Sequence, residues 1–188
     1  MNIMMPEAAW LPSRAATHAD VAVEILFYGI GECALGQVLI ARSASGVCAI
    51  LLSADHDELA ADLAARFPRA RLVANEAMVR DDLAKVIRFV NKPSEGLHLT
   101  LDMRGTAFQR RVWEKLRAIP VGRTVSYGEV ARWVGPLTSP RAVAAACAAN
   151  PIALAIPCHR VVRSAGALAG YRWGIERKRE LIRQEAMA

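Results

Sequence analysis

The chain has 188 residues, of which 54% are apolar and 22% charged, and this composition excludes a disordered or fibrous protein. A membrane span is excluded too, because the longest uncharged stretch, 142–158, is interrupted by Asn150 and two prolines. The first ten residues lack the apolar region of a secretory signal, so we expect a cytoplasmic protein.

Charge is distributed unevenly along the chain. The net charge is +6, yet residues 1–103 carry nine Lys and Arg against thirteen Asp and Glu, whereas residues 104–188 carry fifteen against five. A basic C-terminal half favours a polyanionic partner such as nucleic acid. Charge alone leaves open the alternative that this half only keeps the chain in solution.

The first third of the sequence predicts an arm followed by strands. Residues 1–20 show no periodicity and contain two prolines, which indicates an irregular arm. Apolar segments rich in Val, Ile and Leu follow at 21–30, 35–41 and 46–53, separated by glycines. They predict an antiparallel meander.

Two helices and a linker complete the first half. Asp55 and Asn75 are typical helix caps, and they predict helices over 55–67 and 75–91. Residues 91–96 have the composition of a linker and precede a short alternating segment. We therefore expect a domain boundary close to this linker, with domains over 21–102 and 103–188.

The second half begins three helices with clear caps. Thr106 is followed by Gln109 and Ser126 by Glu129, which are both capping boxes, and Ser139 precedes a proline at the first helical position. The two later helices are joined by a short turn, which is typical of a helix-turn-helix and equally of a plain helical hairpin. The predicted helices span 106–118, 127–134 and 140–149.

The last of these helices has an unusual surface. One long cation, Arg141, stands at its start and is followed mainly by alanines. Small side chains allow close approach to another helix or to a narrow nucleic-acid groove. Because a cation at a helix N-terminus opposes the helix dipole, Arg141 favours a functional role.

The cysteines and histidines predict thiol chemistry and neither a metal site nor a cofactor. They show no C-x-x-C pair and no zinc-ligand spacing. A buried cysteine is most often a small apolar residue, but Cys158 has His159 as its neighbour and stands in the basic half, where cations lower a thiol pKa.

Glu185 is a candidate to orient His159. In a final helix over 174–185 it shares a face with Leu181 and Ile182, although its place near the terminus favours a solvated carboxylate. A Cys, His and acid set also suggests a thiol hydrolase. Adjacent residues of an extended segment point in opposite directions, however, which makes direct contact between Cys158 and His159 awkward.

Five strings carry a specific resemblance: GTAFQRRVW, VSYGEVARWVG, SPRAVAAACAANP, IPCHRVV and GYRWGIERK. They are similar to the O6-alkylguanine-DNA alkyltransferase family, strongly over 105–185 and more weakly over 21–102. The resemblance implies an α/β (α+β) protein. Its small ribonuclease-H-like antiparallel sheet domain would precede a helical, winged-helix-like helix-turn-helix domain that binds DNA.

The resemblance also implies an activity, that of a methylated-DNA–protein-cysteine methyltransferase. Such a protein would flip O6-methylguanine, and also O4-methylthymine, out of double-stranded DNA approached from the minor groove, and transfer the alkyl group irreversibly to itself. It would act once, as a monomer without a cofactor, and associate with the nucleoid when bound to DNA. A relative that only flags damage is the alternative, but such proteins lack the acceptor cysteine.

The resemblance assigns roles to individual residues. Cys158 would accept the alkyl group, with His159 as base through a bridging water and Glu185 behind it. Asn150 and Tyr127 would hold the flipped base, and Arg141 would fill the gap left in the duplex. We expect DNA contacts from Tyr127, Arg141, Ala142, Ala145 and Arg160, and a substrate pocket bounded by Ala153, Tyr171 and Trp173, in which bulky adducts are poorly accepted.

Overall fold

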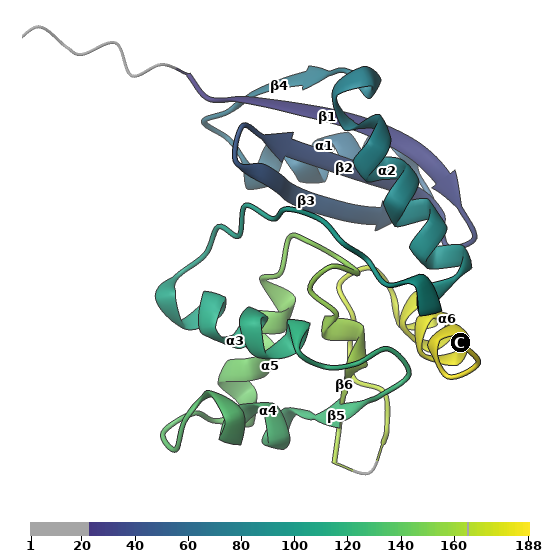
Figure 1. Ribbon diagram of the computed structural model, residues 1–188. Coiled ribbons are helices and arrows are strands. Elements are labelled where there is room, and N and C mark those ends of the chain that lie inside the picture. The colour runs from purple at the N-terminus through teal and green to yellow at the C-terminus, as the bar shows by residue number, and fades with distance from the viewer. Residues whose placement is uncertain (1–22, 165) are drawn as a thin grey trace, which may run out of the picture.

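A four-stranded sheet forms the N-terminal half of the protein (Figure 1). The computed structural model describes residues 23–164 and 166–188, so the predicted arm over 1–20 lies outside the described residues. The strand order is β3-β2-β1-β4. The strands are β1 (Ile25–Cys33), β2 (Gly36–Ser43), β3 (Gly46–Ser53) and β4 (Arg71–Ala74).

The predicted antiparallel meander is confirmed, with one addition. Strands β1, β2 and β3 pair antiparallel, whereas the short β4, which no pattern predicted, pairs parallel to β1. Two of its four residues are charged or small, so it lacks the apolar run that marks the other strands. The sheet is therefore mixed rather than purely antiparallel.

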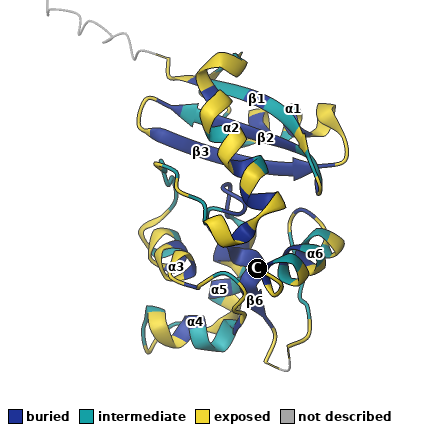
Figure 2. Ribbon diagram, turned by 45° about the vertical axis from the view of Figure 1, so that its right-hand side comes forward, coloured by how far each residue is buried: buried dark blue, intermediate teal, exposed yellow. Residues whose placement is uncertain are grey.

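Helices α1 (His56–Arg66) and α2 (Glu76–Asn91) cover opposite faces of the sheet (Figure 1). Asp55 and Asn75 cap them as predicted, each accepting a hydrogen bond from a backbone N–H in the first turn. Helix α2 lies close to β1 at Gly29. A Cβ added there would lie only 2.7 Å from a methyl carbon of Val79, so the position has no room for a side chain. With both faces covered, β3 is buried along its whole length (Figure 2).

The free edge of β3 is covered by the segment around Thr100 and by the C-terminal half. The N–H of Val47 donates to the carbonyl of Thr100 at 2.9 Å, and the N–H of Ile50 donates to that of Pro151 at 3.0 Å. The N–H of Ala153 returns a bond to the carbonyl of Ile50 at 2.9 Å. These bonds protect an apolar edge strand and fix the loop that leads to Cys158 against the sheet.

The C-terminal half is built mainly of helices around a small two-stranded sheet. Both capping boxes are present, and Ser139 caps the third helix with Pro140 at its first position. The turn between α4 and α5 agrees with the helix-turn-helix prediction. The helices are α3 (Ala107–Arg117), α4 (Tyr127–Val134), α5 (Pro140–Ala148) and α6 (Ile175–Glu185). Strand β5 (Val125–Ser126) pairs parallel to β6 (Val161–Val162), and a short 3-10 turn, η2, spans Cys158–Arg160. Another 3-10 turn, η1 (Pro93–Glu95), lies in the linker before this half.

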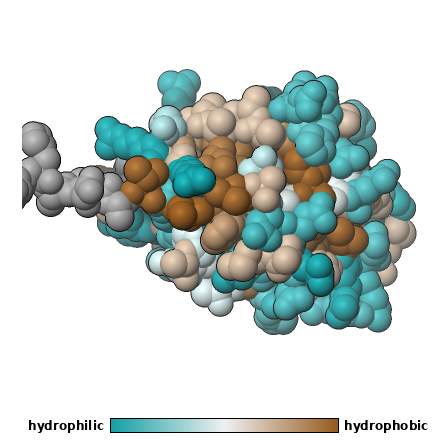
Figure 3. All heavy atoms as spheres, turned by 90° about the horizontal axis from the view of Figure 1, so that it is seen from above, coloured by the Kyte–Doolittle hydropathy of each residue, from teal (hydrophilic) through white to brown (hydrophobic). Residues whose placement is uncertain are grey.

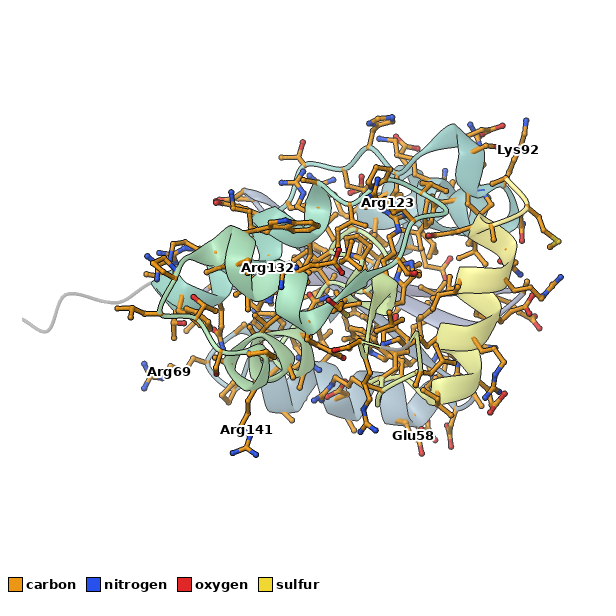
Figure 4. All side chains as sticks on the ribbon, turned by 90° about the horizontal axis from the view of Figure 1, so that it is seen from below. Glu58, Arg69, Lys92, Arg123, Arg132 and Arg141 are labelled. Atoms are coloured by element: carbon orange, nitrogen blue, oxygen red, sulfur yellow. The ribbon has the colours of Figure 1, made fainter. Side chains whose placement is uncertain are left out.

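Exposed apolar side chains occur in both halves of the described chain. Seen from above, apolar side chains gather near the start of the described chain (Figure 3). Val23 and Ile25 are exposed at that start, and Trp133 and Leu137 are exposed on and after α4. The face seen from below carries Arg123, Arg132 and Arg141 (Figure 4). No helix within the described ranges is long and apolar enough to cross a membrane.

Candidate active site and nucleic-acid interface

A cleft of about 720 Å³ opens between helix α5, the start of α4 and the loop that leads to α6. Cys158 and Tyr127 both line it, as does Arg141 at its rim. Cys147 and Ala144 contribute the wall that α5 presents to the cleft. With Tyr171, the cleft thus brings together four of the residues singled out in the sequence.

Cys158 lies in the one-turn helix η2, not in the extended segment that the sequence suggested. The residue is only 4% exposed. Burial raises the pKa of its thiol, while a hydrogen bond from Asn150 and the charge of Lys178 act in the opposite direction. A base is therefore needed to remove the thiol proton at neutral pH.

Asn150 holds the loop before the cysteine at three points. Its Nδ2 donates to the carbonyl of Ile156 at 2.9 Å and to the sulfur of Cys158 at 3.4 Å. Its Oδ1 accepts the N–H of Ile152 at 2.9 Å. Because the side chain is fully buried and these bonds are satisfied, the amide is fixed with one N–H aimed at the sulfur.

His159 and Glu185 form a buried pair behind the cysteine. The distance from Nε2 of His159 to Oε1 of Glu185 is 2.8 Å, and neither side chain is more than 1% exposed. Nδ1 of His159 has no hydrogen-bond partner among the described residues. Since an ionised carboxylate can only accept, Nε2 carries the proton and Nδ1 presents a lone pair.

The pKa values of this pair support that protonation state. Burial lowers the pKa of His159, more than its bond to Glu185 raises it, and so favours the neutral imidazole. Burial alone would raise the pKa of Glu185, but the hydrogen bonds from His159 and Arg160 outweigh it and lower this pKa to about 2. A neutral histidine on an ionised glutamate is ready to accept a proton.

The predicted DNA contact of Arg160 is corrected by the structure. Its Nε and Nη2 donate to the carboxylate of Glu185 at 2.7 and 2.8 Å, and its Nη1 donates to the carbonyl of Ile119 at 2.5 Å. The residue is 6% exposed. Its donors are thus used inside the protein, where they fix Glu185, and they are not available to a DNA phosphate.

The other predicted DNA contacts lie at the surface of α4 and α5. Arg141 is exposed and projects away from the molecule (Figure 4). Ala145 is exposed and Ala142 half-buried, on the same helix. Tyr127 is half-buried, and burial, together with the nearby thiols of Cys147 and Cys158, raises its pKa to about 12.

Of the three predicted pocket residues, only Tyr171 lines the cleft. Trp173 packs against it edge to face, with ring centroids 5.1 Å apart, and is 5% exposed. Ala153 is fully buried and bonded to β3 through its backbone. Trp173 therefore lies behind the wall that Tyr171 forms, and Ala153 belongs to the core under the loop.

The chain is similar to several known proteins. The sequence model of the protein family described as the DNA-binding domain of 6-O-methylguanine DNA methyltransferase matches residues 107–187. The crystal structure of the Mycobacterium tuberculosis O6-methylguanine methyltransferase is 32% identical, covers 86% of this chain and 93% of that chain, and has a TM-score of 0.66. The chain belongs to the O6-methylguanine-DNA methyltransferase family.

Two further relatives agree with this membership. The bifunctional transcriptional activator and DNA repair enzyme Ada of Escherichia coli K12 is 48% identical over 159 residues, which are 85% of this chain and 45% of Ada. The M. tuberculosis protein OGT has been solved in complex with DNA and aligns with a TM-score of 0.68, at 32% identity over 86% of this chain and 93% of that chain. The chain spans about half the length of Ada.

Lys178 is a buried cation beside this cleft that the sequence pattern did not single out. It is fully buried on α6, and its Nζ donates to the carbonyl of Val161 at 2.5 Å and lies 6.0 Å from the centre of the Tyr127 ring. Burial lowers the pKa of Lys178. Its spacing from Leu181 and Glu185 on one helix face was the available signal.

Proposed function

We propose that this chain repairs O6-alkylguanine in duplex DNA by transferring the alkyl group to its own Cys158. The observation that carries the proposal is a cleft with a cysteine at its wall and a buried His159–Glu185 pair behind it. The family relationship, and a relative solved in complex with DNA, support the choice of substrate.

The first step removes the thiol proton. Nδ1 of His159 has a lone pair and no protein partner, so it can take the proton of Cys158 through a water molecule. Glu185 then stabilises the imidazolium that forms, while Asn150 donates a hydrogen bond to the thiolate. Lys178 adds a positive charge close to the developing anion.

The second step transfers the alkyl group. The thiolate attacks the alkyl carbon in line with the C–O bond, an S–C bond forms, the C–O bond breaks, and its electron pair leaves with guanine. Tyr127, a neutral phenol at neutral pH, can donate a proton to the departing base. The thioether has no route to hydrolysis, so each molecule acts once.

Access to the alkylated base requires that it leave the duplex. Arg141 stands at the rim of the cleft, and the neighbouring surface of α5 carries small side chains that allow close approach to a minor groove. Extrusion costs a few kcal/mol, and less for a base that pairs badly, which favours the damaged nucleotide. We extend the proposal to O4-methylthymine for the same reason.

The test is mass spectrometry of the intact protein and its peptides after incubation with excess duplex carrying one O6-methylguanine. We expect one methyl group on Cys158 per molecule and no further turnover. Cys158→Ser should accept none, whereas Cys33→Ser, altered on β1 away from the cleft, should react like the wild type.

Two other outcomes would contradict the proposal. Tight binding of the damaged duplex without methyl transfer would identify a protein that only flags damage. Neither binding nor transfer, together with turnover of an ester or peptide, would identify a thiol hydrolase.

A further inference from the structure

Asp62 on helix α1 is shared by two arginines. Its Oδ1 accepts a hydrogen bond from Nε of Arg66 at 3.2 Å and another from Nη2 of Arg172 at 2.7 Å. Arg66 is the next-turn neighbour of Asp62, whereas Arg172 comes from the loop before α6, 110 residues away. One carboxylate oxygen thus compensates two guanidinium groups.

The arrangement leaves the inner arginine incompletely bonded. The side chain of Arg66 is 13% exposed, and its Nη2 is buried without a hydrogen-bond partner among the described residues. A buried donor without a partner is unfavourable. Arg172 bonds Oδ1, the same oxygen that accepts from Arg66, so its departure would leave that oxygen to Arg66 alone.

Arg172 is the arginine that is able to leave. Its side chain is 40% exposed, three times the exposed fraction of the Arg66 side chain. Arg172 also lines the cleft, together with Tyr127, Arg141 and Cys158. Arg172 therefore bonds the carboxylate on α1 and also borders the cleft that an extruded base would enter.

The N-terminal half reaches the same side of the molecule as helix α5. Seen from below, Glu58 on α1 and Arg141 on α5 project from the same edge (Figure 4). The ion pair of Asp62 and Arg172 joins α1 to the loop that carries Tyr171 into the cleft. A duplex seated on Arg141 would therefore run past α1.

We propose that Arg172 binds a backbone phosphate of the DNA at the mouth of the cleft, and that Asp62 holds this arginine in the DNA-free protein. When DNA binds, Arg172 moves from the carboxylate to the phosphate, and Asp62 stays paired with Arg66. The inference rests on the proposed function only in taking duplex DNA as the ligand.

The experiment measures the affinity for an undamaged duplex as a function of salt concentration. Each phosphate contact contributes about −0.9 to the slope of log K against log salt. We expect Arg172→Gln to make the slope less negative by about 0.9. Arg183→Gln, which alters another arginine paired with an acid on α6, should leave the slope unchanged.

Asp62→Asn should change the affinity for DNA in the opposite direction to Arg172→Gln. This difference distinguishes the inference from a purely structural role of the ion pair. Removing the competing carboxylate should tighten DNA binding by about two- to fivefold, the range of an exposed ion pair. Asp81→Asn on α2, which removes the same charge on the other face of the sheet, should leave the affinity unchanged.

Two results would overturn the inference. An unchanged salt slope for Arg172→Gln would show that this arginine does not contact a phosphate. Weaker binding for Asp62→Asn, in parallel with Arg172→Gln, would show that the pair only holds the loop. A wild-type protein that binds no DNA would instead overturn the proposed function.

Discussion

The carboxylate of Glu185 joins His159 to Arg160, accepting from the imidazole at 2.8 Å and from the guanidinium at 2.7 and 2.8 Å. Both basic side chains are consecutive in the chain and lie in the turn that carries Cys158. The acid comes from the last turn of α6. One carboxylate thus sets the histidine tautomer and neutralises a buried arginine.

Glu185→Gln should affect both the rate of alkyl transfer and the stability of the fold. Loss of an oriented base lowers the transfer rate by about 100-fold or more. The buried Arg160 loses its counter-charge, which lowers the free energy of unfolding by about 3 kcal/mol. Single-turnover kinetics and urea denaturation measure the two effects, and Glu176→Gln, exposed on the same helix, is the control. A variant that transfers at the wild-type rate would remove Glu185 from the mechanism.

Asn150→Ala tests the support of the loop before Cys158. The change leaves the N–H of Ile152 without its partner, at about 1 to 3 kcal/mol, whereas the carbonyl of Ile156 still accepts from the N–H of Cys158. It also removes the N–H that faces the sulfur, so the thiol pKa rises and transfer slows. Thermal unfolding and a thiol titration check the two parts. A Cys158 pKa equal to that of the wild type would contradict the second.

Arg141→Ala should affect extrusion and nothing else. The side chain is exposed, so the free energy of unfolding should change by less than about 0.5 kcal/mol. Transfer from a damaged duplex should slow by at least about tenfold, because extrusion costs a few kcal/mol that Arg141 would offset. Transfer from O6-methylguanine as the free base should be unchanged. Equal slowing on both substrates would show that Arg141 does not act on the duplex.

Trp173 provides a test of adduct size. Its ring supports Tyr171 from behind, so the cleft wall cannot yield to a bulky group. We expect the wild type to react poorly with O6-benzylguanine as the free base and Trp173→Phe to react faster, while both variants repair methylated duplex similarly. Efficient benzyl transfer to the wild type would contradict this reading of the pocket.

Acid should destabilise the protein through His159 before it affects Glu185. The folded pKa of His159 lies below its unfolded value of about 6.5, so the unfolded chain binds the extra proton and stability is lost as pH falls below about 6.5. The slope is about 1.4 kcal/mol per pH unit for one proton. The contribution of Glu185 is lost only further down, toward its pKa of about 2. Urea denaturation between pH 8 and pH 5, compared with His159→Gln, measures the first part; identical profiles would contradict it.

Much of the secondary structure follows from local signals in the sequence. The caps at Thr106, Ser126 and Ser139 each involve a hydrogen bond to an N–H three residues away, so the interacting groups are adjacent in the chain. Three apolar segments rich in Val, Ile and Leu and separated by glycines predicted the antiparallel meander of the first three strands. Strand β4 escaped prediction because four residues carry too little pattern.

The motif around Cys158 also predicted where the chemistry lies, but the roles of its neighbours depend on tertiary contacts. The residue pattern favoured a solvated Glu185, and the resemblance led us to expect a DNA-bound Arg160, yet the two side chains are buried against each other. Arg160 and Glu185 lie 25 residues apart in the chain and meet only because α6 packs on the turn η2. Charge sharing among Asp62, Arg66 and Arg172 is hidden from the sequence for the same reason. A side chain's local neighbours choose its helix or strand, whereas burial and ionisation depend on groups that the fold brings together from distant positions.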